Sequence, residues 1–511
     1  MLSKLFSSTI FGVEAYIVEV EIDVRPGLPV FNIVGLPDTA VQESRERVRS
    51  AIRNSELEFP MQRITVNLAP ADIKKEGPVF DLPIALGILA ADGQINSNSL
   101  EKYLIIGELS LDGSIKPVNG VLPIALMAKK LNKKKLLVPK ANANEAGIIE
   151  PLEVFPVNSL YEVVELLNEK ISIEPIAVNI KDLFNQNKDN QIDFAEVKGQ
   201  EHAKRALEVA AAGRHNVIMI GPPGSGKTML ARRLTTILPS LTLEESIEIT
   251  KLYSIANLLP ANSPLITDRP FRAPHHTISN VGLIGGGRFP RPGEISLSHN
   301  GVLFLDELPE FSRSALESLR QPLEDGIVTI SRSLNSVDYT AAFMLVASLN
   351  PCPCGYFGDS VKACTCSSSQ IVKYRSKISG PLLDRIDIHI EVPRVSCQEV
   401  MKSNTIENSC TVRERVENAT IIQRERLKED NIFCNAQMSR KKIERYCQID
   451  LNCKNLLYKA IDKLNLSTRA YDRILKVART IADLEKSESI KISHLSEAIQ
   501  YRSLDRKLWL Y

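Results

Sequence analysis

The residues best suited to chemistry stand in two segments that each follow an apolar run. The first is GPPGSGKT (221–228), which follows apolar residues 217–220 and precedes a helical pattern. This matches G-x-x-x-x-G-K-[ST] in the strand–loop–helix context that the motif requires. Its glycines let backbone N–H groups surround phosphates, and the helix N-terminus adds positive potential. The segment therefore predicts a site for ATP and Mg²⁺, in which Lys227 reaches the β- and γ-phosphates and Thr228 ligates the metal. The predicted loop residues are Gly221, Pro222, Pro223, Gly224, Ser225, Gly226, Lys227, Thr228 and Met229.

The second segment is an apolar run, 302–305, that ends in two carboxylates, Asp306 and Glu307. Such a run is typical of a buried parallel strand. Asp306 is predicted to hold Mg²⁺, directly or through water, and Glu307 to act as general base on the attacking water. The next strand pattern ends in Asn350, whose amide could orient that water.

Three later arginines complete the predicted catalytic set. Arg385 stands on a short helical pattern before another apolar run, and Arg469 and Arg473 share one helical face. Arginine suits a γ-phosphate because its planar fork donates two hydrogen bonds and stays charged. For each arginine, a surface ion pair is the alternative interpretation.

The nine cysteines all lie from residue 352 onward. Two pairs, Cys352 with Cys354 and Cys364 with Cys366, flank a short loop and could enclose a tetrahedral structural Zn²⁺. Their C-x-C spacing is tighter than the usual C-x-x-C. Reduced thiols without a metal are therefore the alternative.

Length and composition limit the number of domains and the class of protein that can position these groups. A chain of 511 residues is too long for one core and indicates two or three domains. The hydrophobic fraction is 44% and the formal net charge +2, so a basic surface would have to be local. The long apolar stretch 82–91 is too short to cross a bilayer, and the first residues lack a cleavage site. We expect a cytoplasmic protein with no membrane partner.

Periodicity divides the chain into four parts. Residues 1–168 alternate between strand patterns at 15–24, 64–67 and 103–109 and helical patterns at 38–55, 80–91 and 121–131, with Asp38 placed to cap the first helix. Residues 169–194 are polar and predict a linker. A second α/β domain is predicted over 195–395, and a charged, all-helical domain over 396–511.

The succession of P-loop, Asp-Glu strand, Asn strand end, LLDRID and late helical arginine resembles an AAA+ ATPase, with an αβα core and a helical lid. The resemblance implies that Asn350 is sensor 1, that Arg385 reaches into a neighbouring subunit's site, and that Arg469 is sensor 2, with Arg473 the second choice. A finger acting in trans implies a ring, typically a hexamer.

More specific phrases narrow the resemblance. VKGQEHAKRALEVAAAGRHNVIMIGPPGSGKT, RPFRAPHHTISNVGLIGGG, LFLDELPEF and ASLNPCPCG resemble the magnesium-chelatase-like branch of AAA+, and within it the bacterial YifB/ComM group. That group implies DNA as the substrate, with ATP-driven branch migration of recombination intermediates during natural transformation. Gly199 and Gln200 resemble the stretch that lines the adenine pocket in this branch.

The first domain resembles the proteolytic domain of Lon, which has a ribosomal-S5-like α/β fold. The resemblance rests on KKEGPVFDLPIALGILAADG and GELSLDGSIKPVNGVLPIALMAKKL. Val79 and Ile124 stand where Lon carries its nucleophile and its lysine. Neither hydrocarbon can be activated as a nucleophile or act as a base, so this domain is not expected to be a protease.

The segment 269–300 between the two halves of the ATP site corresponds to an insertion in this branch that typically faces the ring's pore. We expect it, together with a hairpin over 325–346, to contact DNA, because arginines repeated around a ring form a belt that binds phosphates without reading sequence. Subunit packing is the alternative. The histidines could stack, hydrogen-bond or ligate a metal, although two ligands are few. The candidate contacts are Arg269, Arg272, His275, His276, Arg288, Arg291 and Arg332.

Together these features predict a hexameric AAA+ motor that hydrolyses ATP to move along single-stranded or branched DNA. A chelatase motor that remodels a partner protein is the alternative, disfavoured by the Lon-like domain. An assembly scaffold is disfavoured by Glu307 and Arg385, which a scaffold would not need.

Overall fold

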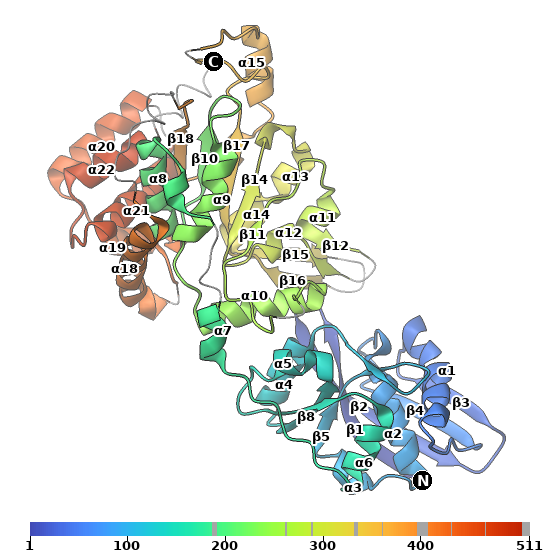
Figure 1. The fold of residues 1–511 in the computed structure, drawn as a ribbon. Coiled ribbons are helices and arrows are strands. Elements are labelled where there is room, and N and C mark those ends of the chain that lie inside the picture. Colours follow the sequence, from blue (N-terminus) through green and yellow to red (C-terminus); the bar gives the residue numbers. More distant parts are fainter. Residues whose placement is uncertain are drawn as a thin grey trace. The chain divides into compact units, whose positions relative to one another are not determined.

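The computed structural model describes residues 1–186, 192–260, 263–287, 290–331, 336–359, 361–395, 407–430, 432–464 and 467–502. The chain forms two compact units, shown as a ribbon in Figure 1. Unit 1 comprises residues 1–187, 246–267 and 331–338, and unit 2 comprises 188–245, 268–330 and 339–511. Among the described residues, no helix is both long and apolar enough to cross a membrane.

Unit 1 is built on a seven-stranded sheet with the order β3-β4-β2-β1-β5-β8-β9. Strands β1, β2 and β4 pair antiparallel, whereas β3–β4 and the run β1-β5-β8-β9 are parallel. The strands are β1 (Leu2–Phe11), β2 (Glu14–Arg25), β3 (Val30–Val34), β4 (Arg63–Ala69), β5 (Tyr103–Ile105), β8 (Lys135–Pro139) and β9 (Glu153–Val157), with a separate ribbon of β6 (Glu108–Leu109) and β7 (Ile115–Lys116).

The core of unit 1 is centred on helix α2 (Asp81–Ala91), all of whose residues are buried. A helix that is apolar on every side is stable only when it is covered on every side. A Cβ on Gly87 would lie 2.2 Å from Cδ1 of Ile22, so this glycine lets α2 lie directly on β2. The side chain of Asp38 accepts a hydrogen bond from the N–H of Val41 at 2.8 Å, which confirms the predicted cap of α1.

The helices of unit 1 and of the segment after it are α1 (Thr39–Asn54), α2, α3 (Ser97–Leu100), α4 (Val121–Lys130), α5 (Ala143–Ala146), α6 (Leu160–Leu167) and α7 (Ile180–Gln186). Helix α7 falls inside the stretch predicted to be a linker. Ile124 is 1% exposed in α4 and Val79 packs against the core, so apolar packing occupies both positions that would have to carry protease chemistry.

Unit 2 contains a five-stranded, fully parallel sheet with the order β11-β14-β17-β10-β18. Its strands are β11 (Phe271–Arg272), β14 (Val302–Leu305), β17 (Met344–Leu349), β10 (Val217–Ile220) and β18 (Ile388–Glu391). Every residue of β10, β14 and β17 is buried. The wholly apolar runs in the sequence therefore correspond to central parallel strands, as expected.

The C-terminal helices pack on the side of this sheet that carries α8 (Glu201–Gly213) and α9 (Lys227–Ile237). They are α18 (Ser409–Leu427), α19 (Arg440–Tyr446), α20 (Leu451–Leu464), α21 (Thr468–Leu484) and α22 (Ile492–Gln500). Helices α18 and α21 both contact α8, and Figure 1 shows these helices in orange and red beside α8. Their apolar faces join one core cluster with the sheet and α8. The fold class is confirmed: an α/β domain is followed by a second α/β domain with a parallel sheet and by a helical C-terminal region.

The remaining elements lie between β10 and β18 in the sequence and belong to unit 2, except that most of α10 and of β16 belongs to unit 1. They are α10 (Leu243–Ala256), which continues into unit 1, α11 (Asn280–Ile284), β12 (Gly285–Gly286), β13 (Arg291–Pro292), α12 (Glu294–Leu297), α13 (Arg313–Ser318), α14 (Arg320–Asp325), β15 (Ile327–Ser331), β16 (Ser336–Thr340), α15 (Ser368–Arg375) and α16 (Gly380–Leu383). Strands β15 and β16 form a two-stranded sheet within the stretch predicted to be a hairpin.

Arg269 requires a correction, because its side chain is buried rather than presented to a ligand. Its guanidinium donates to the carbonyl oxygens of Pro239 and Asn300 at 2.6 Å each and pairs with Glu245 at 3.0 Å. Glu245 also pairs with Arg214. Arg269 is therefore a structural cation inside unit 2, and the expectation that it contacts DNA is wrong.

The Arg214–Glu245–Arg269 cluster carries a strongly shifted acid. Burial alone would raise the pKa of Glu245, but attraction to Arg214 and Arg269 lowers it to about 2. Burial and the neighbouring Arg214 lower the pKa of Arg269. The carboxylate is thus the anion that allows two cations to be buried side by side.

Replacing Glu245 by Gln should leave Arg269 buried without its anion and lower the free energy of unfolding by about 3–5 kcal/mol at neutral pH. The folded-state pKa of Glu245 is about 2, against an ordinary value of 4.5. The stabilisation is therefore complete above the ordinary pKa and is lost as the pH falls toward the folded-state value. Urea unfolding at several pH values should show the two proteins converging in that window.

The matched control is Glu244→Gln, which changes the exposed neighbouring carboxylate. It should alter the unfolding free energy by less than about 0.5 kcal/mol. A difference between wild type and Glu245→Gln that stays constant from neutral to acid pH would contradict the assigned pairing.

Candidate functional site: a nucleotide site at the carboxyl edge of the parallel sheet

The phosphate-binding loop lies between the end of β10 and the start of α9. Gly224 and Gly226 have φ values of 75° and 89°, in the left-handed region that favours glycine. A Cβ on Gly221 would lie 2.1 Å from the carbonyl oxygen of Val392, so no other residue fits there. Helix α9 begins at Lys227 and directs its N-terminus at the loop. Pro222, Pro223 and Ser225 complete the predicted loop, whose shape is that of an anion cradle.

Lys227 is held inside this loop. Its Nζ donates to the carbonyl oxygens of Gly221 at 2.7 Å and Pro222 at 3.0 Å, and to Oδ1 of Asn350 at 3.3 Å. Burial lowers its pKa, while the carboxylates of Asp306 and Glu307 oppose that shift. The ammonium therefore joins the loop to the end of β17, and the predicted role of Asn350 in orienting water stays a prediction.

Thr228 and Asp306 meet at the position predicted for Mg²⁺. The Thr228 hydroxyl donates to Oδ2 of Asp306 at 2.8 Å. Oδ1 of Asp306 accepts hydrogen bonds from the Ser348 hydroxyl and from the N–H of Glu307, the latter at 3.1 Å. The Thr228 hydroxyl and Oδ2 of Asp306 lie next to each other and are suitable oxygen ligands for Mg²⁺. The hydrogen bonds to Oδ1 fix the orientation of the Asp306 carboxylate.

Glu307 lies next to His276, which the sequence analysis predicted as a candidate DNA contact. Its backbone is left-handed, with φ 53°, and its side chain is 53% exposed. The Nδ1 atom of His276 lies 3.9 Å from its carboxylate, and the rings of His275 and His276 are 4.0 Å apart. A cavity of about 260 Å³ is lined by Thr228, Arg232, Ala273, Pro274, His275, His276, Phe304, Asp306 and Glu307. The basic insertion therefore begins at the ATP site itself.

Gln200 braces the loop from the opposite side. Its Nε2 donates to the carbonyl oxygens of Ser225 at 2.7 Å and Pro393 at 3.0 Å. Gly199 and Gln200 both have positive φ, 66° and 56°, where the chain turns into α8. Met229 is 36% exposed on α9. The role of these residues in an adenine pocket stays a prediction.

Of the three predicted finger and sensor arginines, Arg385 lies directly against the carboxylate of Glu324. Arg385 pairs with Glu324 and donates to the carbonyl oxygen of Pro381 at 2.6 Å. The hydrogen bond from Arg385, and then attraction to Arg469 and Arg473, lowers the pKa of Glu324. Residues far apart in the sequence thus form one cationic group.

This arginine group lies at the edge of the sheet opposite the P-loop. Arg473 pairs with Asp387, which directly precedes β18, and the Asn216 amide donates to the carbonyl oxygen of Arg385 just before β10. The P-loop follows the other end of β10, and a strand of four residues spans roughly 13 Å. Within one chain, the structure therefore does not bring Arg385 or Arg473 to Lys227.

Asp387 anchors this edge because it is a buried acid with several cationic or donor neighbours. Burial would raise its pKa, but attraction to Arg473 and the hydrogen bond from His215 hold the pKa well below its usual range. His215 also contacts the Thr480 hydroxyl at 2.8 Å through its other ring nitrogen. The network joins β18, β10 and α21.

The remaining insertion residues differ in what their side chains contact. Arg272 pairs with Glu294 through two hydrogen bonds, 2.6 and 2.7 Å. Arg291 is exposed on β13, and His275 is exposed with a hydrogen bond to Thr277 at 2.9 Å. Arg288 and Arg332 lie outside the described residues. Of the predicted DNA contacts that can be placed, Arg291 and His275 are the accessible ones.

The four cysteines predicted to bind a metal come together in space. The sulfurs of Cys352, Cys354, Cys364 and Cys366 all lie within 4.8 Å of one another, and no other group of three or more candidate ligands occurs in the described part of the chain. Backbone N–H groups of Thr365 and Tyr356 lower the pKa of Cys354 to about 5, which favours its thiolate. The histidine pair has no third ligand among the residues described.

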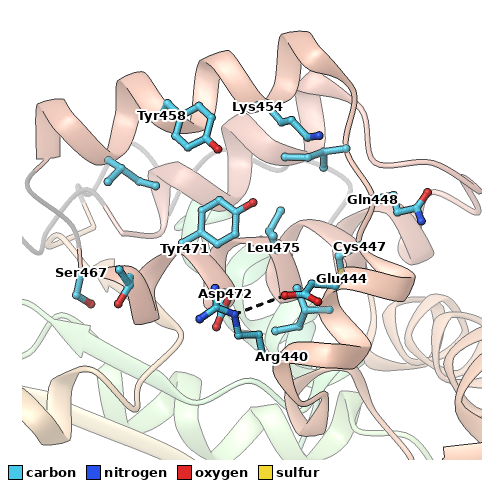
Figure 2. Close-up of a pocket in the computed structure, with 14 residues that line it drawn as sticks. Arg440, Glu444, Cys447, Gln448, Lys454, Tyr458, Ser467, Tyr471, Asp472 and Leu475 are labelled. Atoms are coloured by element: carbon cyan, nitrogen blue, oxygen red, sulfur yellow. Dashed lines mark ion pairs between the residues drawn. The ribbon is translucent and has the colours of Figure 1, made fainter.

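A larger cavity of about 830 Å³ lies elsewhere, among helices α19, α20 and α21. Figure 2 shows Tyr458 and Tyr471 on neighbouring helices and the ion pair between Arg440 and Glu444, whose closest atoms are 3.6 Å apart. None of the predicted catalytic or nucleotide-binding residues lines it.

Two residues of the site were not predicted. Ser348, which positions Asp306, was recognisable as the single polar residue in the apolar strand MLVASL. Glu324, which pairs with Arg385, lies in α14, whose sequence has no distinctive pattern. Only the fold reveals its role.

Three family models together cover most of the chain. "Magnesium chelatase, subunit ChlI" matches residues 193–400, "Subunit ChlI of Mg-chelatase" matches 20–142, and "Magnesium chelatase, subunit ChlI C-terminal" matches 406–502. The first of these contains the P-loop, Asp306, Asn350 and the cysteine group.

Relatives match over nearly the full length. The competence protein ComM of Haemophilus influenzae is 45% identical over 510 residues, which are 99% of this chain and 98% of the relative. The protein YifB of Escherichia coli is 42% identical over 99% of this chain and 98% of its own length. A Mycobacterium tuberculosis protein, Rv2897c, is 40% identical over 98% of both chains. The chain therefore belongs to the YifB/ComM group of magnesium-chelatase-like AAA+ proteins.

Proposed function

We propose that this protein is an ATP-hydrolysing ring motor that acts on DNA, driving branch migration of recombination intermediates. The observation that carries the ATPase part of the proposal is the contact set Lys227–Asn350 and Thr228–Asp306 at the carboxyl edge of the parallel sheet. It is supported by full-length relatedness to a protein named for competence. The expected setting is the cytoplasm.

Hydrolysis is assigned to the groups at that edge. The loop N–H groups and Lys227 bind the phosphates, and Thr228 and Asp306 hold Mg²⁺, which neutralises charge on the phosphate oxygens. Glu307 accepts the proton of the attacking water, and Asn350 orients that water. His276 lies beside Glu307 and can hold its carboxylate aside or release it.

The position of the arginine group is the argument for a ring. Arg385 and Arg473 are displaced from their own P-loop to the opposite edge of the sheet. A guanidinium there can meet a γ-phosphate only in a neighbouring chain. Chains that each supply a finger to the next form a closed ring, and we expect a hexamer as in similar AAA+ ATPases.

The insertion supplies the argument for DNA as the substrate. It runs from His276, next to the catalytic carboxylate, to the β12–β13 ribbon with the exposed Arg291. A cation on such a ribbon, repeated in every subunit, would contact phosphates without reading bases. A motor that remodels a protein partner would need no such cations, so a response to DNA separates these two functions.

Glu307→Gln should retain ATP binding and lose hydrolysis, with kcat reduced by about 10²–10⁴-fold, because the amide cannot accept the water's proton. Phosphate release and binding of a fluorescent ATP analogue measure the two effects separately. The matched control is Glu310→Gln, which removes only a surface pair with Lys377 and should hydrolyse ATP normally. Unaltered turnover by Glu307→Gln would exclude this residue as the base.

Complementation should show that the arginine finger acts between chains. Lys227→Ala and Arg385→Ala chains should each be inactive alone, and rings containing both should regain part of the ATPase activity, since an intact loop can then face an intact finger. The control mixture is Lys227→Ala with Glu307→Gln, in which every site is damaged and no activity should return. No regain in the first mixture would refute a finger acting in trans.

Single-stranded and four-way-junction DNA should stimulate ATPase activity, and the stimulation should weaken between low and moderate salt. Arg291→Ala should reduce the affinity for DNA of any sequence and flatten the salt dependence. The control is Arg445→Ala on α19, whose side chain is 62% exposed. Absence of a DNA response at either salt concentration would refute the DNA motor and favour the protein-remodelling alternative.

A further inference from the structure

The four clustered cysteines form a metal-binding geometry that follows directly from the end of β17. Cys352 Sγ lies 3.3 Å from Cys354 Sγ and 3.6 Å from Cys364 Sγ, and Cys354 Sγ lies 3.6 Å from Cys364 Sγ. Cys366 joins them within the same 4.8 Å limit. Four thiolates bound to Zn²⁺ at about 2.3 Å stand about 3.8 Å apart, so the sulfurs already approximate a tetrahedron.

Two backbone N–H groups donate to the sulfurs of the cluster. The N–H of Cys354 donates to Cys366 Sγ, and the N–H of Cys366 donates to Cys364 Sγ, each at 3.4 Å. Gly355 and Gly358 have φ values of 86° and 79°, which lets the chain turn tightly enough for C-x-C pairs to converge. Four soft sulfur ligands with no oxygen ligand favour Zn²⁺ over Mg²⁺ or Ca²⁺.

The cysteine loop, defined here as residues 351–359 and 361–367, rests on the P-loop. A Cβ on Gly355 would lie 2.6 Å from Cδ of Pro223, so the two loops touch. The Arg394 guanidinium donates to the Pro223 carbonyl oxygen at 3.5 Å and lies 3.8 Å from the Asp359 carboxylate.

A second anchor fixes the start of the cysteine loop. The Arg375 Nε donates to the carbonyl oxygen of Pro351 at 3.1 Å, and the same guanidinium lies over the Phe357 ring, 5.1 Å from its centre. Pro351 directly follows Asn350, the partner of Lys227. Disorder in the cysteine loop would therefore change the positions of both Asn350 and Pro223.

We propose that Cys352, Cys354, Cys364 and Cys366 bind one Zn²⁺ and that this ion holds the cysteine loop against the P-loop, so that nucleotide binding depends on the metal. The four ligands close the loop, and the closed loop positions Pro223 and Asn350. The metal site is independent of the function proposed above, whereas its effect on nucleotide rests on the assignment of the P-loop as the ATP site.

Metal analysis of the full-length chain, purified without added metal and again after equilibration with zinc and dialysis, tests the site itself. We expect one zinc ion per chain, lost in the double variant Cys364→Ser/Cys366→Ser and retained in Cys410→Ser, which removes an exposed cysteine on α18. Replacement by Co²⁺ should give the intense absorption of tetrahedral thiolate ligation. A chain without bound zinc in both preparations, with its four thiols free or paired in disulfides, would overturn the proposal.

The link to nucleotide is measured by titrating wild-type protein with a fluorescent ADP analogue before zinc removal by a chelator, after it, and after zinc is restored. We expect binding to weaken on the order of tenfold and then to recover, while circular dichroism shows the fold retained. Unchanged affinity in zinc-free protein would refute the link between metal and P-loop while leaving the site standing. This readout requires neither DNA nor hydrolysis, so a failure of the proposed motor function would not affect it.

Discussion

The parallel pairing of β14, β17 and β10 is the constraint on which the rest of the structure depends. Ile220 is in register with Leu349, and Leu305 with Ala347. Because the strands run in one direction, the residues that follow them emerge at one edge. The P-loop, Asp306 and Asn350 are therefore neighbours although the insertion separates them in sequence. The insertion leaves the sheet after β11 and returns before β14 without altering this register.

The common direction of the strands also determines which residues lie at each edge of the sheet. The carboxyl edge holds the P-loop and Asp306, whereas the amino edge holds two ion pairs, Arg385 with Glu324 and Arg473 with Asp387. In the ring that we propose, each chain would hold half of a composite site at each edge. The buried acids Glu245 and Asp387 maintain the amino side, because each holds cations that could not be buried alone.

Much of this arrangement could be predicted from residues whose local chemistry is restrictive. The glycines of the P-loop, the apolar runs of β10 and β14 and the cap at Asp38 each have few structural meanings, and the fold class follows from them. Strands β1, β3, β8 and β9 were not predicted, because short apolar runs do not reveal which neighbour they pair with. Arg269 was misassigned because a buried and an exposed arginine look alike in sequence, and its carbonyl partners come from distant loops.

The sequence by itself determined which groups are present: a phosphate cradle, paired carboxylates, late arginines, four cysteines in two C-x-C pairs, and a first domain without protease side chains. Only the tertiary structure decided which of them meet. It placed His276 beside Glu307, and it paired Arg385 with Glu324 away from the P-loop. It also brought four sulfurs together in a loop that touches Pro223 through Gly355. The reason is that local pattern limits the conformation of a segment, whereas contacts between segments depend on strand order and on the packing of side chains distant in sequence.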